Sequence, residues 1–179
     1  MSGSKPRVNA QGRIYIQADS PREPLDTIEK RERSLTIYAD HGDWSAPTPF
    51  TSFARYPSRI ENLASKRDES KRGRKRLIAI DPNVRIAKGL PFLHMETEML
   101  RYGVGDPYGR GYESYGDEYI TLWEVTADEV VGCWDWEDDD WYKDVVLPAF
   151  RKHDGRFKAL TGFGMGADVL REVGIPGFL

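Results

Sequence analysis

The chain has 179 residues, of which 39% are hydrophobic and 12% aromatic, and it carries a net charge of −3 with a pI near 5.7. This length and composition are typical of a folded domain with its own core and exclude a wholly disordered chain. The acidic balance argues against a nucleic-acid-binding surface over the whole protein. No apolar run approaches the roughly 18 residues of a membrane-spanning helix, so we expect no membrane partner.

The beginning of the chain lacks the apolar core of a secretory signal, and Cys133 is the sole cysteine in the sequence. These features slightly favour a cytoplasmic location and leave a secreted mature form as the alternative. We expect a polar tail over residues 1–11, a single domain over 12–155, and an irregular C-terminal tail over 156–179 that packs on the domain.

In the first half of the chain, short patterned runs predict strands separated by turns. Residues 13–19 alternate polar and apolar side chains, as in a strand with one buried face. We expect a helical turn around 25–30, a weak strand over 35–39, a strand over 50–53 and a helix that begins near Pro57. The basic run over 66–76 is interpreted as a solvated loop, with a phosphate or nucleic-acid contact as the alternative.

In the second half, the apolar run 77–80 predicts a strand that ends at Asp81 and Pro82. A helix is expected from Pro91 to Tyr102, followed by strands over 118–125 and 129–136. A last helix is expected to begin near the three aspartates at 138–140 and to stop at Gly155. Because the helices do not alternate regularly with the strands, the pattern favours an α+β fold with a mixed, mostly antiparallel sheet.

Several classes of site find no support in the sequence. The three histidines and Cys133 lack the paired spacing of a zinc site, so no metal is predicted. The run G-F-G-M-G over 162–166 does not lie between a clear strand and a helix, and we interpret it as a loop and not as a nucleotide fingerprint. The signatures of a serine nucleophile are also absent.

One carboxylate is better placed for chemistry. The stretch S-Y-G-D-E-Y-I-T-L-W-E-V over 114–125 puts Glu118 at the entrance of a strand, directly after a loop rich in Gly and Tyr. Such a position holds an acid in a cleft and directs it at a substrate. A solvated surface acid that pairs with a basic residue is the alternative.

Three motifs give the chain a resemblance to the ADP-ribosyltransferase fold family, over roughly residues 13–136. The run Y-I-Q-A-D-S-P-R-E-P over 15–24 is similar to the first strand of the cholera-toxin-like branch, which reads about Y-R-A-D-S-R-x-P. The run F-T-S-F over 50–53 resembles that branch's central S-T-S element. The run G-D-E over 116–118 resembles its Glu-x-Glu element, with Glu118 in the second, catalytic position.

Two further branches show similarities. The run G-D-E-Y-I resembles the glutamate strand of poly-ADP-ribose polymerases, which carry a single glutamate. Fungal ADP-ribosyltransferase-like domains combine a D-H…W…P-F-x-S-(F/W) stretch with a later D-E-Y, and this combination is similar to residues 40–53 and 117–119 here. The resemblance implies a split sheet with flanking helices and, with the toxin-like branch, an effector or toxin role.

The resemblance implies NAD as the substrate and cleavage of the nicotinamide–ribose bond. In that reading Glu118 stabilises the positive charge that develops on the ribose, as in glycoside hydrolysis, and Ser52 orients the carboxylate or the ribose. Thr51 supports the strand. An aromatic ring of the 102–119 loop stacks on nicotinamide, with Tyr112 and Tyr115 as the candidates and Tyr119 the weakest because it points to the opposite face.

Two positions depart from the toxin-like pattern. Gln17 stands where that branch has the arginine that grips NAD, so Gln17 and Asp19 are expected to hold the dinucleotide less strongly, and Arg22 is a candidate that folds back beyond the prolines. Gly116 replaces the first acid of Glu-x-Glu, which disfavours transfer to arginine. The readings left open are an active transferase or NAD glycohydrolase, with a protein, nucleic-acid, small-molecule or water acceptor, and a degenerate binding module that has lost the reaction.

Overall fold

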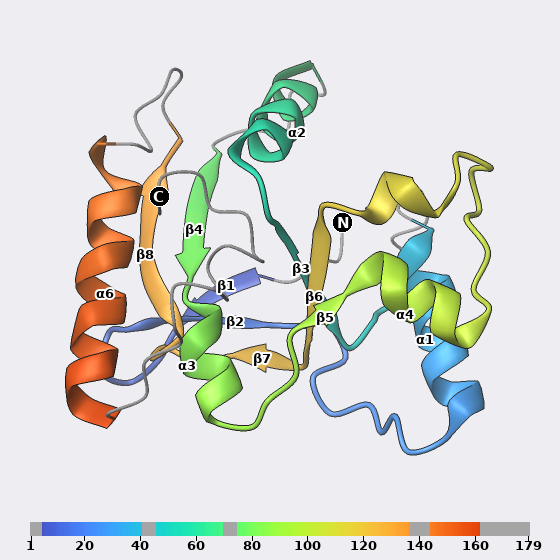
Figure 1. Cartoon of the computed structure of the whole chain (residues 1–179), viewed down its shortest axis with the longest axis horizontal. Helices are drawn as coiled ribbons and strands as arrows, with labels where there is room; N and C mark the ends of the chain where they lie inside the picture. Colours follow the sequence, from blue (N-terminus) through green and yellow to red (C-terminus); the bar gives the residue numbers. More distant parts are fainter. Residues whose placement is uncertain (1–4, 41–45, 70–74, 137–143, 162–179) are drawn as a thin grey trace. The chain divides into compact units, whose positions relative to one another are not determined.

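The computed structural model describes residues 5–40, 46–69, 75–136 and 144–161 (Figure 1). Within this part the protein is a mixed α+β structure with small antiparallel sheets, in agreement with the expected class. It forms two compact units, the first made of residues 1–54 and 91–127 and the second of 55–90 and 128–179. In its described part no helix has the length and apolar character needed to cross a membrane.

The first unit contains two three-stranded sheets. One has the order β1 (Lys5–Val8), β2 (Ile14–Gln17) and β7 (Glu124–Val125), and the other β3 (Phe50–Ala54), β6 (Glu118–Leu122) and β5 (Leu93–His94). The strands predicted over 13–19 and 50–53 are therefore confirmed, whereas the single strand predicted over 118–125 is two strands, β6 and β7, in different sheets. Strand β1 lies within the segment expected to be a polar tail, and its backbone pairs with β2 from Lys5 opposite Gln17 to Val8 opposite Ile14.

Trp123 connects the two sheets, because it lies between β6 and β7 in the chain. Its φ of 61° is rare for a bulky residue and turns the chain at this point. The conformation is held by three hydrogen bonds: its N–H donates to Pro49 O at 2.7 Å, its carbonyl accepts from Ala18 N at 2.7 Å, and its indole donates to Glu23 O at 2.9 Å. The eight residues from 118 to 125 thus contribute a strand to each sheet.

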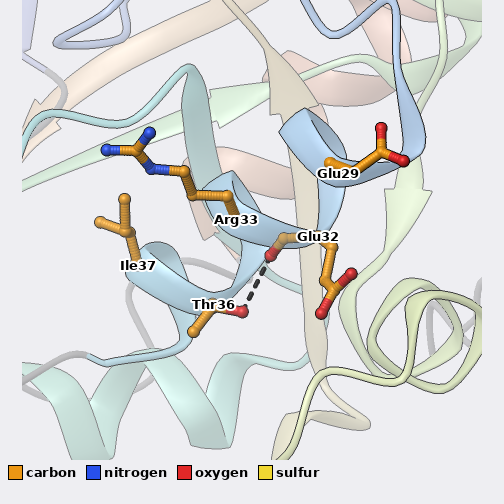
Figure 2. A pocket seen from close by; sticks show the side chains of 5 residues that line it. All are labelled: Glu29, Glu32, Arg33, Thr36 and Ile37. Atoms are coloured by element: carbon orange, nitrogen blue, oxygen red, sulfur yellow. Dashed lines mark hydrogen bonds between the residues drawn. The ribbon is translucent and has the colours of Figure 1, made fainter.

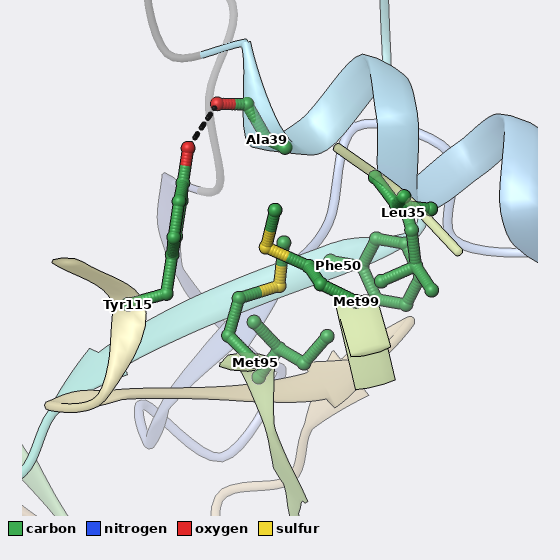
Figure 3. Packing of buried hydrophobic residues seen from close by; sticks show 8 residues of the cluster. Leu35, Ala39, Phe50, Met95, Met99 and Tyr115 are labelled. Atoms are coloured by element: carbon green, nitrogen blue, oxygen red, sulfur yellow. Dashed lines mark hydrogen bonds between the residues drawn. The ribbon is translucent and has the colours of Figure 1, made fainter. Parts of the chain in front are cut away.

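Helices α1 (Ile28–Ala39) and α4 (Met95–Tyr102) pack together in the first unit and cover its core. Thr27 caps α1 by accepting a hydrogen bond from Lys30 N, and Gly103 ends α4 in the left-handed conformation, as predicted. The weak strand expected over 35–39 is wrong, because these residues are the last turns of α1. Figure 3 shows the packing of the core, whose buried members are Leu35, Ala39, Phe50, Met95, Met99, Val104, Tyr115 and Ile120.

The second unit contains the antiparallel pair β4 (Arg76–Ile80) and β8 (Val130–Asp135) with helices α2 (Pro57–Glu69), α3 (Pro82–Ala87) and α6 (Val146–Thr161). The strands predicted over 77–80 and 129–136 and the helix from Pro57 are confirmed. Helix α3 was not predicted. Asp81 caps it by accepting a hydrogen bond from Asn83 N, and Pro82 occupies its first turn, where a missing N–H costs nothing.

Helix α6 continues through Gly155 to Thr161, so the predicted stop at Gly155 is wrong and part of the expected C-terminal tail is helical. Most of the side chains buried in the described part of this unit are polar: Asp81, Asn83, Arg85, Glu129 and Asp154, with Val84 the apolar one. The three aspartates at 138–140, the run over 162–166 and part of the basic run over 66–76 lie outside the described residues.

Candidate functional site

Glu118 is the first residue of β6, and the tyrosine at the end of α1 fixes its carboxylate. The phenol of Tyr38 donates a hydrogen bond to Oε1 of Glu118 at 2.7 Å, across 80 residues of chain. Both side chains are half-buried. A hydrogen bond to an ionised carboxylate is about twice as strong as one between neutral groups, so this contact restrains the direction in which the acid points.

Ser52 joins the same group from the neighbouring strand. In the β3–β6 pairing Ser52 lies opposite Ile120, which puts its side chain on the same face as Glu118, two residues along β6. Its hydroxyl hydrogen-bonds Tyr38. The two residues that the sequence singled out as catalytic, Glu118 and Ser52, therefore meet through a third residue that the sequence analysis did not select.

The electrostatics of Tyr38 follow from this position. Burial first, and then the negative charge of Glu118, raise the pKa of Tyr38 well above its usual value of 10, and the hydrogen bond from Ser52 opposes this only in part. Tyr38 therefore stays protonated at physiological pH and acts as a donor to the carboxylate. Its ring also packs against the Phe50 ring, edge-on, with centroids 5.4 Å apart, so the donor is held by the core.

Thr51 points away from this group. It is opposite Thr121 in the same strand pair, so its side chain lies on the other face of the sheet, where it is buried at 4% exposure. That face also carries Tyr119, whose ring stacks on Phe92 with centroids 5.1 Å apart. Thr51 supports the strand, as expected, and Tyr119 points away from Glu118, also as expected.

Gln17 belongs to a different sheet from Glu118. It pairs with Glu124 in β7, and the turn at Trp123 separates β7 from the strand that begins with Glu118. Asp19 and Arg22 are exposed after the end of β2. These three sequence-predicted NAD contacts thus lie on or after a strand of the other sheet of the first unit.

The two candidate aromatic residues of the loop belong to the core. Tyr115 is 1% exposed, and its hydroxyl donates to Ala39 O at 3.1 Å (Figure 3). The same hydroxyl lies 3.0 Å from Asp106 Oδ1. Burial, followed by the hydrogen bond to Asp106 and its charge, raises the pKa of Tyr115 to about 12. Tyr112 is half-buried against the same cluster. The Tyr115 ring is therefore closed to a ligand, whereas the Tyr112 ring is only partly buried.

The end of the loop that precedes Glu118 is held at Gly116 by residues at the start of α4. His94 hydrogen-bonds Gly116 O through Nε2 at 2.8 Å and Thr97 Oγ1 through Nδ1 at 2.9 Å. Gly116 lies against the carboxylate of Glu96, since a Cβ at Gly116 would be 3.2 Å from Glu96 Oε2. The first turn of α4 thus braces the turn from which β6 begins.

A shallow pocket of about 490 Å³ lies elsewhere, along the outer side of α1 (Figure 2). Its lining residues are Glu29, Glu32, Arg33, Thr36 and Ile37, none of which belongs to the Tyr38–Glu118–Ser52 group. Among the described residues, no set of three or more His, Cys, Asp or Glu side chains is arranged to hold a metal ion.

The sequence signal that would have found Tyr38 is the spacing of its neighbours. Leu35 and Ala39 are four residues apart and both are buried, which is the pattern of a helix face. Read as a helix that starts after the Thr27 cap, this segment ends beside the Glu118 strand. Comparison with protein-family models, with curated proteins and with solved structures finds no match to this chain.

Proposed function

We propose that the chain is an NAD-dependent ADP-ribosyltransferase or NAD glycohydrolase with Glu118 as its catalytic carboxylate. The observation that supports it is the hydrogen-bonded group that Glu118 and Ser52 form through Tyr38. These two residues were selected from the sequence, on strands 66 positions apart in the chain, and they lie on the same face of one sheet. The order of the three motifs gives the further support for the ADP-ribosyltransferase fold.

The chemistry follows from a fixed negative charge beside a reacting ribose. The C1′–N bond of NAD breaks with its electron pair leaving on neutral nicotinamide, and positive charge develops on the ribose. The Glu118 carboxylate stabilises that charge, and Tyr38 holds the carboxylate in place without neutralising it. The lone pair of water or of another acceptor then forms the new bond to C1′, and the acceptor's proton passes to the carboxylate.

The test is release of nicotinamide from NAD by the purified protein and by Glu118→Gln. We expect the variant to lose at least about 100-fold in rate, because the charge that stabilises the transition state is removed while the shape is kept. Asp117→Asn is the matched control, since Asp117 is the neighbouring carboxylate, exposed in the turn that precedes the strand. Equal rates for the wild type and Glu118→Gln would overturn the proposal.

The second candidate is a binding module that has the fold and has lost the reaction. It is favoured by Gln17, which is neutral and lies beside Glu124 in the other sheet. The discriminating result is the absence of both nicotinamide release and an NAD-induced rise in Tm. That outcome would replace the enzyme with the interaction module.

A further inference from the structure

Arg110 presents a guanidinium that is mounted on aromatic rings and half-exposed. Its Cζ lies 4.5 Å from the centroid of the Tyr108 ring and 5.9 Å from that of Tyr115, and its side chain is 52% exposed. The nearest carboxylate contact is long, with Nη2 3.9 Å from Asp106 Oδ1, and one further hydrogen bond goes to the Tyr115 hydroxyl. A guanidinium has five N–H donors, so these two contacts leave donors for an anion.

The two rings that contact Arg110, Tyr108 and Tyr115, are hydrogen-bonded to the C-terminal end of α1, the same end that fixes Glu118. Three consecutive residues of α1 and its cap make three contacts: Tyr38 donates to Glu118 at 2.7 Å, Ala39 O accepts from Tyr115 at 3.1 Å, and Asp40 accepts from Tyr108 at 2.8 Å. The ring closest to the Arg110 guanidinium is that of Tyr108. Tyr108 is bound to Asp40, which follows by two residues the tyrosine that holds the candidate catalytic acid.

The loop itself is pre-organised around Asp106. That carboxylate accepts hydrogen bonds from the backbone N–H groups of Tyr108 at 3.1 Å and Gly111 at 3.1 Å, and from that of Arg110. Its side chain is 5% exposed. Because the backbone on both sides of Arg110 is fixed, little conformational entropy is lost when the guanidinium binds a ligand.

A dinucleotide carries two negative charges on its diphosphate, and a site that binds it needs a cation near the acid that acts on the ribose. Gln17 does not supply one, as it is neutral and belongs to the other sheet of the first unit, where it pairs with Glu124. Two arginines elsewhere in the first unit make close contacts of their own: Arg31 donates to Leu25 O at 2.7 Å and Arg13 to Ala127 O at 2.7 Å.

We propose that Arg110 is the diphosphate-binding residue of the site, held over Tyr108 for that purpose. The proposal rests on the function proposed above, from which it takes the nucleotide diphosphate as the ligand class. In this proposal, a residue of the loop that precedes Glu118 takes the role of the arginine that Gln17 replaces in the first strand.

The experiment measures binding of ADP, which contains the diphosphate and has no bond that the enzyme cleaves, by calorimetry on the full chain. We expect Arg110→Gln to weaken ADP binding by about 10- to 100-fold, as for loss of a charge-assisted hydrogen bond, and Arg110→Lys to weaken it less. Adenosine, which lacks phosphates, should bind the wild type and Arg110→Gln equally. Arg101→Gln is the matched control, since its side chain is 60% exposed in the same unit.

Equal ADP affinity for wild type and Arg110→Gln, or an equal loss in Arg101→Gln, would overturn the assignment. A Tm for Arg110→Gln within about 2 °C of the wild type shows that the loop has kept its fold, and Arg110→Lys provides the comparison if it has not. Glu118→Gln separates the two proposals, because it should abolish nicotinamide release and leave ADP binding intact. Nicotinamide release that persists in Glu118→Gln, with ADP binding still dependent on Arg110, would overturn the catalytic role of Glu118 and keep the diphosphate site.

Discussion

Arg85 and Glu129 form an ion pair of 2.8 Å in the second unit, with side chains that are 2% and 0% exposed. Such a pair contributes little net stability, because both charges have lost their hydration, but its geometry makes each partner indispensable to the other. In a unit whose buried side chains are mostly polar, this pair and its neighbours take the place that an apolar cluster has in the first unit.

Removing one partner of this pair is therefore expected to be severe. Glu129→Leu should lower the free energy of unfolding by about 3–5 kcal/mol, because it leaves a buried guanidinium without its counter-charge. The double variant Arg85→Met, Glu129→Leu should recover much of that loss. Urea unfolding measures both. Lys88→Ala provides the control, since its 3.3 Å pair with Asp128 is exposed and should be worth no more than about 1 kcal/mol. A loss below that in Glu129→Leu would contradict the expectation.

The second unit should also depend on pH through His153. Its Nδ1 lies 3.0 Å from Asp81 Oδ2, and this hydrogen bond, partly opposed by burial, raises the pKa of His153 above its usual 6.5. A raised folded-state pKa stabilises the protonated form, so the contribution to stability is complete below pH 6.5 and is lost as the pH rises through the folded-state pKa.

The measurement is the free energy of unfolding of wild type and His153→Gln from pH 5.5 to 9. The difference between them should shrink as the pH rises, and an NMR titration should give a His153 pKa above 6.5 that falls in Asp81→Asn. His94→Gln, in the first unit, is the control for a general effect of losing an imidazole. A difference that is constant over this range would show that His153 acts through packing alone.

Tyr38 offers a test within the candidate site. Tyr38→Phe removes the donor to Glu118 and keeps the ring on Phe50, so we expect a loss of about 1–3 kcal/mol in stability, as for a hydrogen bond to a charged group. If Glu118 is catalytic, nicotinamide release should fall at least about 10-fold in kcat, with a smaller change in KM, because the orientation of the acid is lost.

Tyr102→Phe is the matched control for this variant. Tyr102 is also half-buried on the core cluster, and its hydroxyl accepts a hydrogen bond from Arg31 at 3.2 Å. A similar fall in kcat for both variants would assign the effect to general loosening of the core.

Asp106 is expected to control the loop in a pH-dependent way. Burial raises its pKa, but the hydrogen bonds from Tyr108, Arg110 and Tyr115 together lower the pKa of Asp106 below its usual 3.8. Its contribution to stability is therefore present above pH 3.8 and is lost as the pH falls through the folded-state value. Asp106→Asn should lower Tm at pH 7 and lower it much less at pH 2.5. The same variant should also shift the pKa of Tyr115 from about 12 towards 10, which a spectrophotometric titration measures. An unchanged Tyr115 titration would contradict the role of this carboxylate.

The sequence predicted those elements in which local pattern and tertiary packing agree. Alternation over 13–19 agrees with burial of Ile16 and Ala18 on one face of the strand, and Pro57 and Gly103 mark helix ends through backbone chemistry that does not depend on the rest of the fold. The segment 35–39 was assigned wrongly because its β-branched and aromatic residues favour a strand locally, whereas burial of Leu35 and Ala39 on one helix face decides the outcome. Asp81 and Pro82 were read as a strand end, although the same pair is also a helix start.

Only part of the candidate site could be predicted from the sequence, for a related reason. Resemblance in linear motifs selects residues one strand at a time, so it identified Glu118 and Ser52 without the helix that joins them. Tyr38 and Arg110 carry no motif. The role of Tyr38 depends on a contact 80 positions away in the chain, and the ring under Arg110 is held by Asp40, 68 positions before Tyr108. Tyr115 was chosen as a ring that could stack on a ligand, but its burial in the core leaves it 1% exposed.

The turn at Trp123 has a consequence for how the first unit unfolds. Because one continuous stretch supplies a strand to both sheets, neither sheet can slip in register or detach without pulling on the other. The hydrogen bond of Glu118 at one end of this stretch and the pairing of β7 with β2 at the other are therefore expected to break in a single cooperative step. Hydrogen-exchange protection of β2 and β6 should then be lost at the same denaturant concentration.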